Sequence, residues 1–231
     1  VTAHIRRKYP LRQYLYGYMA TMTGAEIEVS NDRYFRTSEL LCCLTDTPRT
    51  NLNYYYPKIS RPYRYVRFTP PPPAYPTADC RAEIAELAFF DSVDSEEHLP
   101  SRAIYGGGPV DENPAHDIDK ACDDDWLTFY YSSGPQDSIV FDLQRARVIK
   151  KILFVPRNDD NFITPGNVYE LFYQSGVKGW ISLGVQTATT NELIYRNIPE
   201  GALLWLRNLT RGKEEQVFYV ENDRQRFVGY E

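Results

Sequence analysis

The sequence predicts an all-β protein made of two β-sandwich modules in tandem, of which the first is incomplete. Aromatic residues make up 14% of the chain, including 19 Tyr, and they occur together with 16 Pro and 13 Gly, a composition typical of strands and turns. Short apolar runs alternate with a period of two, as half-buried strands do. A weak internal repeat predicts the tandem arrangement.

Strand-like runs recur along the whole chain, and turn residues separate them. The alternating side chains of each run predict one buried and one solvent-facing side, and runs of this length and spacing are typical of β-sandwiches. The predicted strands are residues 25–30, 39–44, 63–68, 82–90, 138–143, 148–155, 168–173, 180–184, 202–209 and 216–222.

Three pairs of segments form the internal repeat, and they occur in the same order in both halves of the chain. They are "IRRKYP" with "KKILFVP", "AEIEVSND" with "VYELFYQSG", and "RPYRYVRFTPP" with "ALLWLRNLTRG". The third pair aligns Arg67 with Arg207, and the second aligns Glu28 with Glu170. The repeat therefore indicates one complete copy and one copy that lacks its front.

A change in composition marks the predicted module boundary. Residues 91–102 are polar and acidic, and residues 105–117 are rich in Gly and Pro. Such segments commonly separate modules. We therefore predict a partial module over residues 1–94 and a complete one over residues 95–231.

Charge and cysteine usage exclude several classes of protein. The chain has 26 Lys+Arg and 31 Asp+Glu, a formal net charge of −5, with no basic run, so no nucleic-acid partner is expected. No apolar run approaches the roughly 20 residues that span a bilayer, so no membrane span is expected. Cys42, Cys43, Cys80 and Cys122 form no CxxC pair and are expected to be buried thiols.

Four stretches of the second copy carry a resemblance to a known family. They are "DKACDDDWLTFYYS" (119–132), "SIVFDLQRARVIKKILFVPRND" (138–159), "YELFYQSGVKGWISLG" (169–184) and "LLWLRNLTRGKEEQVFY" (203–219). In this order they resemble the discoidin family, also called the coagulation factor V/VIII C-type domain. The resemblance implies jelly-roll sandwiches of the galactose-binding-like kind, which include many carbohydrate-binding modules.

The acidic loop of this resemblance implies a structural Ca²⁺ site. Carried over by position, Asp123 and Asp125 would supply carboxylates, Thr128 its oxygens and Ala121 a carbonyl, all hard oxygen ligands that suit this ion. Asp124 replaces the Gly that the family has in the middle of the loop. Asp tolerates the left-handed backbone better than most residues do.

The last calcium ligand implied by the resemblance is a Glu in the closing strand. Glu215 is the candidate in the second copy, with Glu214 beside it. Glu86 takes that place in the first copy, whose own acidic loop is missing from the chain. The alternative is a solvated acidic turn that binds no metal.

Carbohydrate binding is expected at the loop that follows residues 148–155. Arg157 stands where the resemblance implies an arginine that grips sugar hydroxyls, and aromatic rings in the neighbouring loop would stack on the sugar. The remaining candidates are Asn158, Asp160, Asn161, Trp126, Tyr130 and Tyr131. The alternative is that Arg157 pairs with Asp159 or Asp160 and only shapes the loop.

The expected function is therefore non-catalytic binding of a glycan or polysaccharide. The modules would hold a parent catalytic domain or a cell surface on carbohydrate, and the resemblance implies an extracellular, periplasmic or cell-surface location. The alternative is a pair of structural spacers without a sugar site in a multidomain glycosidase or transglutaminase-like protein. No enzymatic activity is expected, because the adjacent carboxylates Asp159 and Asp160 are poorly arranged to serve as opposed acid and base.

Overall fold

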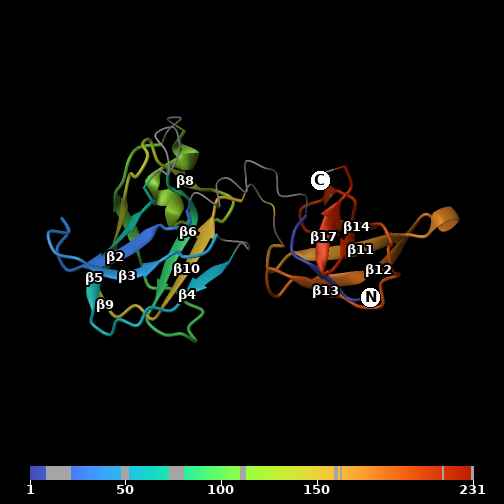
Figure 1. Cartoon of the computed structure of the whole chain (residues 1–231), viewed down its shortest axis with the longest axis horizontal. Helices are drawn as coiled ribbons and strands as arrows, with labels where there is room; N and C mark the ends of the chain where they lie inside the picture. Colours follow the sequence, from blue (N-terminus) through green and yellow to red (C-terminus); the bar gives the residue numbers. More distant parts are fainter. Residues whose placement is uncertain are drawn as a thin grey trace. The chain divides into compact units, whose positions relative to one another are not determined.

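The chain folds mostly into antiparallel β-sheets (Figure 1). The computed structural model describes residues 1–8, 22–47, 52–72, 81–109, 113–158, 161, 163–214 and 216–229. It divides into two compact units. Unit 1 comprises Val1–Arg12 and Asp160–Glu231, and unit 2 comprises Gln13–Asp159.

Unit 2 is a sandwich of two antiparallel sheets. The first has the order β3-β2-β5-β9-β7, with bounds Glu39–Cys43, Glu26–Ser30, Tyr63–Thr69, Ile139–Arg147 and Arg102–Tyr105. The second has the order β4-β10-β6-β8, with bounds Asn53–Tyr55, Lys151–Pro156, Glu83–Phe90 and Tyr130–Tyr131.

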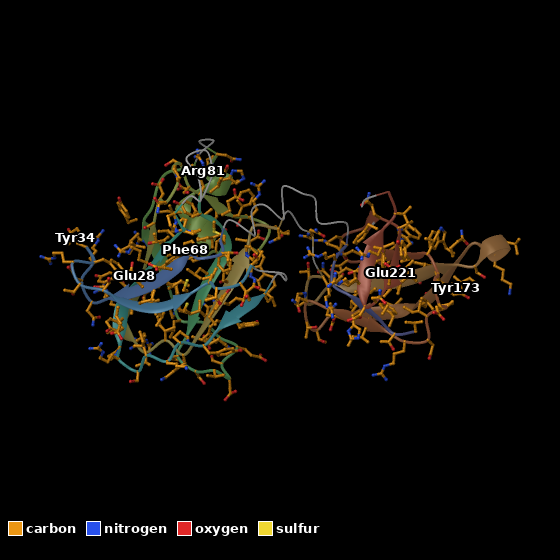
Figure 2. The ribbon with its side chains drawn as sticks, in the orientation of Figure 1. Glu28, Tyr34, Phe68, Arg81, Tyr173 and Glu221 are labelled. Carbon is orange, nitrogen blue, oxygen red and sulfur yellow. The ribbon has the colours of Figure 1, made fainter. Side chains whose placement is uncertain are left out.

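The core of unit 2 lies between its two sheets. Phe68 of β5 stacks on Phe154 of β10 with ring centroids 5.8 Å apart, and Phe89 of β6 meets Phe141 of β9 edge-on at 5.6 Å. All four rings are fully buried, and Figure 2 shows Phe68 inside the unit. Burial of such large apolar surfaces is the main force that holds the sheets together.

Unit 1 contains a larger sheet and a two-stranded one. The larger sheet has the order β12-β11-β14-β16-β17, and β15 also pairs with β14. Their bounds are Trp180–Thr187, Val168–Gln174, Leu204–Asn208, Phe218–Glu221, Arg224–Phe227 and, for β15, Lys213–Glu214. The small sheet joins β1 (Ala3–Ile5) to β13 (Leu193–Tyr195).

A second apolar core belongs to unit 1. Ile5 and Leu193 of the small sheet are buried in one cluster with Leu171, Leu206 and Phe218 of the larger sheet. The first residues of the chain and its last third therefore fold together, although roughly 150 residues separate them.

Short 3₁₀ helices are the helical elements of the described residues. They are η1 (Pro114–His116), η2 (Ile118–Ala121) and η3 (Gly176–Lys178). Asn113 caps η1 by accepting a hydrogen bond from the Ala115 amide, and Asp117 caps η2 through the Ile118 amide. Within the ranges that the structure describes, no helix has the length and apolarity needed to cross a membrane.

Each predicted strand run contains a strand of the structure, which confirms the all-β prediction. Short strands such as β4, β7 and β13 were not predicted, because three or four residues are too few for a period of two to show. Of the cysteines, Cys42, Cys43 and Cys122 are free and partly buried, and Cys80 lies outside the described residues.

The internal repeat has matching positions in the two units. In unit 2, Glu28 of β2 lies opposite Arg67 of β5, and in unit 1 Glu170 of β11 lies opposite Arg207 of β14. The next strand also matches, because the Ser38 hydroxyl donates to Glu28 at 2.7 Å and the Ser182 hydroxyl donates to Glu170 at 2.7 Å. The two units thus share one three-stranded arrangement.

The predicted boundary at residue 94 differs from the division that the structure shows. Strands from both sides of that residue pair within unit 2, where β5 pairs with β9 and β6 pairs with β10. The first pair of repeat segments aligns β1 with β10. Strand β1 pairs with β13 in unit 1, and β10 pairs with β4 in unit 2. The division at about residues 12 and 160 therefore replaces the predicted one at 94–95, because strand pairing joins segments that are far apart in sequence.

Candidate functional site

The acidic loop of residues 119–128 closes over the carboxylate of Glu86. Glu86 lies on the fully buried strand β6, and its Oε2 accepts a hydrogen bond from the Asp124 amide at 3.0 Å. Burial, together with the charges of Asp124 and Asp123, raises the pKa of Glu86 to about 8. Glu86, which the resemblance implies for the first copy, therefore lies against the acidic loop of the second copy, and Glu215 lies outside the described residues.

The backbone of this loop agrees with the expectation for Asp124. Its φ angle is 60°, in the left-handed region that Gly favours and Asp tolerates. The Thr128 hydroxyl donates to both oxygens of Asp123, at 3.0 and 2.9 Å. The Asp125 carboxylate accepts from the Leu127 amide at 3.0 Å, so hydrogen bonds within the loop set its shape.

The predicted calcium ligands fit a metal only in part. Among the described residues, no three His, Cys, Asp or Glu side chains gather around one point. The Lys120 ammonium also lies 3.3 Å from Asp123 and supplies a positive charge there. A hard cation would therefore depend on oxygens outside that set, such as the Ala121 carbonyl and the Thr128 hydroxyl, beside Glu86 and Asp123.

Arg157 is held by the protein itself. Its guanidinium lies 4.3 Å from the centre of the Phe129 ring and 3.7 Å from the Glu83 carboxylate. The Arg157 side chain is 17% exposed, and that of Glu83 is 6% exposed. The contact with Glu83 agrees with the predicted alternative, an arginine that shapes its loop, and Asp159 and Asp160 lie outside the described residues.

The neighbours predicted to assist Arg157 are also largely enclosed. The buried Asn158 amide donates to the carbonyls of Trp126 and Pro156, at 3.1 and 3.0 Å. Asn161 is buried as well, and Tyr130 is fully buried and donates its hydroxyl to the Gly107 carbonyl at 3.1 Å.

The remaining predicted sugar contacts divide into two groups. Trp126 and Tyr131 are partly exposed, and Tyr131 lies 5.9 Å from the Arg157 guanidinium. Asp160 lies outside the described residues, as does Asp159, the other partner of the alternative pairing. The structure therefore brings Arg157, Trp126 and Tyr131 to one end of the sandwich.

A hollow lies on the outer face of the five-stranded sheet of unit 2, and we call it the groove. Its main part encloses about 650 Å³ and an adjoining part about 330 Å³, and the two share Arg33 and Ile104. Sites for small ligands commonly have volumes in this range. The residues of the main part are Arg33, Tyr34, Phe35, Arg67, Ile104, Tyr105, Gln136, Asp137, Ser138 and Val140.

Two exposed tyrosines flank the groove. Tyr34 is 78% exposed and Tyr105 is 68% exposed. Figure 2 shows Tyr34 extending outward from the loop after β2. Tyr105 ends β7, next to an irregularity in its pairing with β9, and such bulges redirect side chains.

The loop that carries Tyr34 is organised around Asp32. The Asp32 carboxylate accepts hydrogen bonds from the amides of Tyr34 and Arg36, at 3.1 and 3.2 Å, and from the Arg36 guanidinium at 2.6 Å. These bonds lower the pKa of Asp32 to about 2. Phe35 then takes a positive φ of 51°, which places its ring 4.5 Å from the Arg67 guanidinium.

Paired arginines form the floor of the groove. The Arg67 guanidinium donates to Glu28 at 2.6 and 2.9 Å, and Arg64 makes a two-pronged contact with Asp142 at 2.8 and 2.9 Å. Because both acids are only partly exposed, these pairs fix the floor and keep it polar.

The groove was not predicted from the sequence. The sequence offered one signal, since Tyr34 lies between polar residues in "SNDRYFRTS" and tyrosines in such loops often serve binding. No local sequence pattern, however, places Tyr105 on the same surface as Tyr34, because β5, β9 and β7 are neighbours only in the folded sheet.

No family model, curated protein or solved structure matches this chain. The resemblance to the discoidin family therefore stays a prediction, and functional inference depends on the geometry of the units.

Proposed function

We propose that this chain is a non-catalytic glycan-binding region and that the groove of unit 2 is its binding site. The observation that carries the proposal is the pair of exposed tyrosines, Tyr34 and Tyr105, beside arginines in a hollow of about 650 Å³. This hollow is a different place from the loop of Arg157, which the sequence favoured.

The chemistry of the groove suits a polyhydroxylated ligand. A tyrosine ring offers a flat apolar face to the C–H side of a sugar, and its hydroxyl can hydrogen-bond to the sugar at the same time. Arginine donates hydrogen bonds in a planar fork, which matches neighbouring oxygens on a ring. Arg67 is already oriented by Glu28, so it would lose little freedom when a ligand binds.

Within this proposal the chain serves a larger protein. Discoidin-type jelly-roll modules would hold a parent catalytic domain or a cell surface on polysaccharide, which implies a location outside the cytoplasm. Attachment raises the effective concentration of the parent protein at its substrate. The competing possibility remains a structural spacer without a sugar site.

The test is a glycan-array screen of the chain and of Tyr34→Ala and Tyr105→Ala. Each groove variant should weaken binding by about tenfold, as expected for one lost aromatic contact. Tyr56→Ala is the matched control, because Tyr56 is 58% exposed on the same unit and does not line the groove. Arg157→Ala should lower the stability of unit 2 and leave glycan affinity unchanged.

Two results would contradict the proposal. One is a folded wild-type chain that binds no glycan on the array, which would favour the structural spacer. The other is equal binding by the wild type and both groove variants, which would place the site elsewhere.

We propose separately that Ca²⁺ stabilises the acidic loop and that Glu86 takes the role predicted for Glu215. The support is the enclosed Glu86 carboxylate beside Asp123, since a cation would relieve the repulsion between these acids. Excess CaCl₂ should raise the melting temperature of the wild type relative to a chelator, and Glu86→Gln should abolish the difference. The exposed control Glu97→Gln should retain this difference in melting temperature. A wild-type melting temperature that does not change with Ca²⁺ would exclude the site.

A further inference from the structure

The groove is positively charged although the chain as a whole is acidic. Four arginines line its two parts, namely Arg33, Arg64, Arg67 and Arg102, against the two aspartates Asp137 and Asp142. The formal net charge of the whole chain is −5. A local excess of positive charge inside a concave surface concentrates anions there.

Two of the four arginines are satisfied by the protein. Arg64 makes its two-pronged contact with Asp142, and Arg67 donates to Glu28 while lying over the ring of Phe35. Their charges are largely balanced within the sheet. These two residues therefore build the groove rather than determine the charge of its ligand.

The other two arginines are exposed and carry their charge into the groove. Arg33 lies in the loop after β2 and lines both parts, and Arg102 begins β7 and lines the adjoining part. Within the part of the chain that the structure describes, neither guanidinium makes a hydrogen bond or a close ion pair, although the charge of Arg33 contributes to the lowered pKa of Asp142. An acidic group between them would gain charge-assisted hydrogen bonds without breaking any existing pair.

From this arrangement we propose that the groove selects acidic polysaccharides, with Arg33 and Arg102 binding the carboxylate or sulfate groups and Tyr34 and Tyr105 stacking on the sugar rings. This inference rests on the proposed function and names the class of glycan. A neutral chain would leave both guanidinium groups without a partner, whereas a uronate or a sulfated sugar would satisfy them. Carboxylate and sulfate present similar oxygen pairs to a guanidinium fork, so the structure predicts the anionic class shared by both.

The test is affinity electrophoresis of the full chain in gels that contain polygalacturonate, dextran sulfate or neutral dextran. The first two polymers distinguish carboxylate from sulfate recognition, and the third reports binding without charge. We expect retardation by at least one acidic polymer, and Arg33→Gln and Arg102→Gln should each weaken it by about tenfold. Arg33→Lys keeps the charge without the planar fork and should give an intermediate loss.

Arg145→Gln is the matched control. Arg145 is exposed on β9 of the same unit and does not line the groove, so the change removes one positive charge elsewhere. It should leave retardation unchanged, while added salt should weaken the binding of the wild type because exposed charges are screened. Because Arg33 and Arg102 are exposed and unpaired in the described structure, both variants should fold, which a thermal melt confirms.

The outcomes separate this inference from the proposed function. Retardation by neutral dextran that depends on Tyr34 and Tyr105 but not on the arginines would keep glycan binding and overturn acidic selectivity. An equal loss in Arg145→Gln would show non-specific charge attraction and also overturn it, as would equal retardation by single-stranded DNA. Absence of binding to every polymer here and to every glycan of the array would overturn both.

Discussion

The strand pair β2–β5 of unit 2 and the pair β11–β14 of unit 1 share one pattern but carry different surfaces. Both place a Glu opposite an Arg, and both hold the Glu by a serine hydroxyl at 2.7 Å. In unit 2 the same face is bordered by the Tyr34 loop and by β7, which creates the groove. The shared strands therefore act as a scaffold, and the flanking segments decide what the surface can bind.

In unit 1 the corresponding face carries a cluster of aromatic rings. Trp205 lies 5.4 Å from Phe172 and 5.7 Å from Trp180, and the Arg207 guanidinium lies 5.5 Å from the Trp205 ring. These rings pack on one another. The same backbone arrangement thus produces a recess in one unit and an aromatic patch in the other.

The largest expected effect tests whether each unit has a hydrophobic core that opens independently of the core of the other unit. Phe68→Ala should lower the free energy of unfolding of unit 2 by about 3–5 kcal/mol, because it leaves a cavity against Phe154. Hydrogen exchange should show faster opening of β2 and β5, with β11 and β14 unaffected. Phe172→Ala, on the partly exposed face of unit 1, is the control, and loss of protection in both units would show a single cooperative core.

The next effect tests the equivalence of β1 and β10. Ile5→Ala should lower the free energy of unfolding of unit 1 by about 2–4 kcal/mol, because Ile5 is fully buried opposite Leu193. Hydrogen exchange of β13 should accelerate while that of β4 stays constant. His4→Ala changes a partly exposed side chain on the same strand and should cost far less, and equal effects of the two variants would contradict burial as the cause.

A smaller effect compares the two arginines of the repeat. Arg67→Gln should lower the free energy of unfolding by about 1 kcal/mol, since Arg67 donates two hydrogen bonds to Glu28 in a partly buried site. Arg207→Gln should cost less than about 0.5 kcal/mol, because its described contact is with the Trp205 ring. Urea titrations of both variants measure the difference, and equal losses would show that the Glu28 pair adds nothing to stability.

The smallest effect is a pH dependence that belongs to unit 2. The Arg64 guanidinium lowers the pKa of Asp142, so the pair stabilises the folded state above the unfolded pKa of about 3.9. This stabilisation should disappear as the pH falls through that value toward the lower folded pKa. Urea midpoints from pH 6 down to pH 3 should fall less steeply in Arg64→Gln than in the wild type, and parallel slopes would contradict the pair's contribution.

Local sequence patterns predicted the strands well and did not predict the groove. Runs such as 63–68 and 82–90 match β5 and β6, because alternation and β-branched or aromatic side chains are visible in neighbouring residues. Arg157 was predicted from its place after a strand, yet its exposure depends on Phe129 and Glu83, which come from other elements. The Asp124 amide bonds to Glu86, whereas the closing Glu of the acidic loop was predicted at Glu215, because the predicted boundary at residue 94 assigned Glu86 to the other module.

The sequence by itself determined the all-β class, the position of the longer strands and the repeated Glu–Arg pattern, because each depends on residues close together in the chain. The tertiary structure decided which distant strands pair, and so it brought Glu86 under the acidic loop and Tyr34 and Tyr105 to one groove. The physical reason is that an isolated strand can satisfy its backbone hydrogen bonds with many partners. The burial of a whole core selects one set of them.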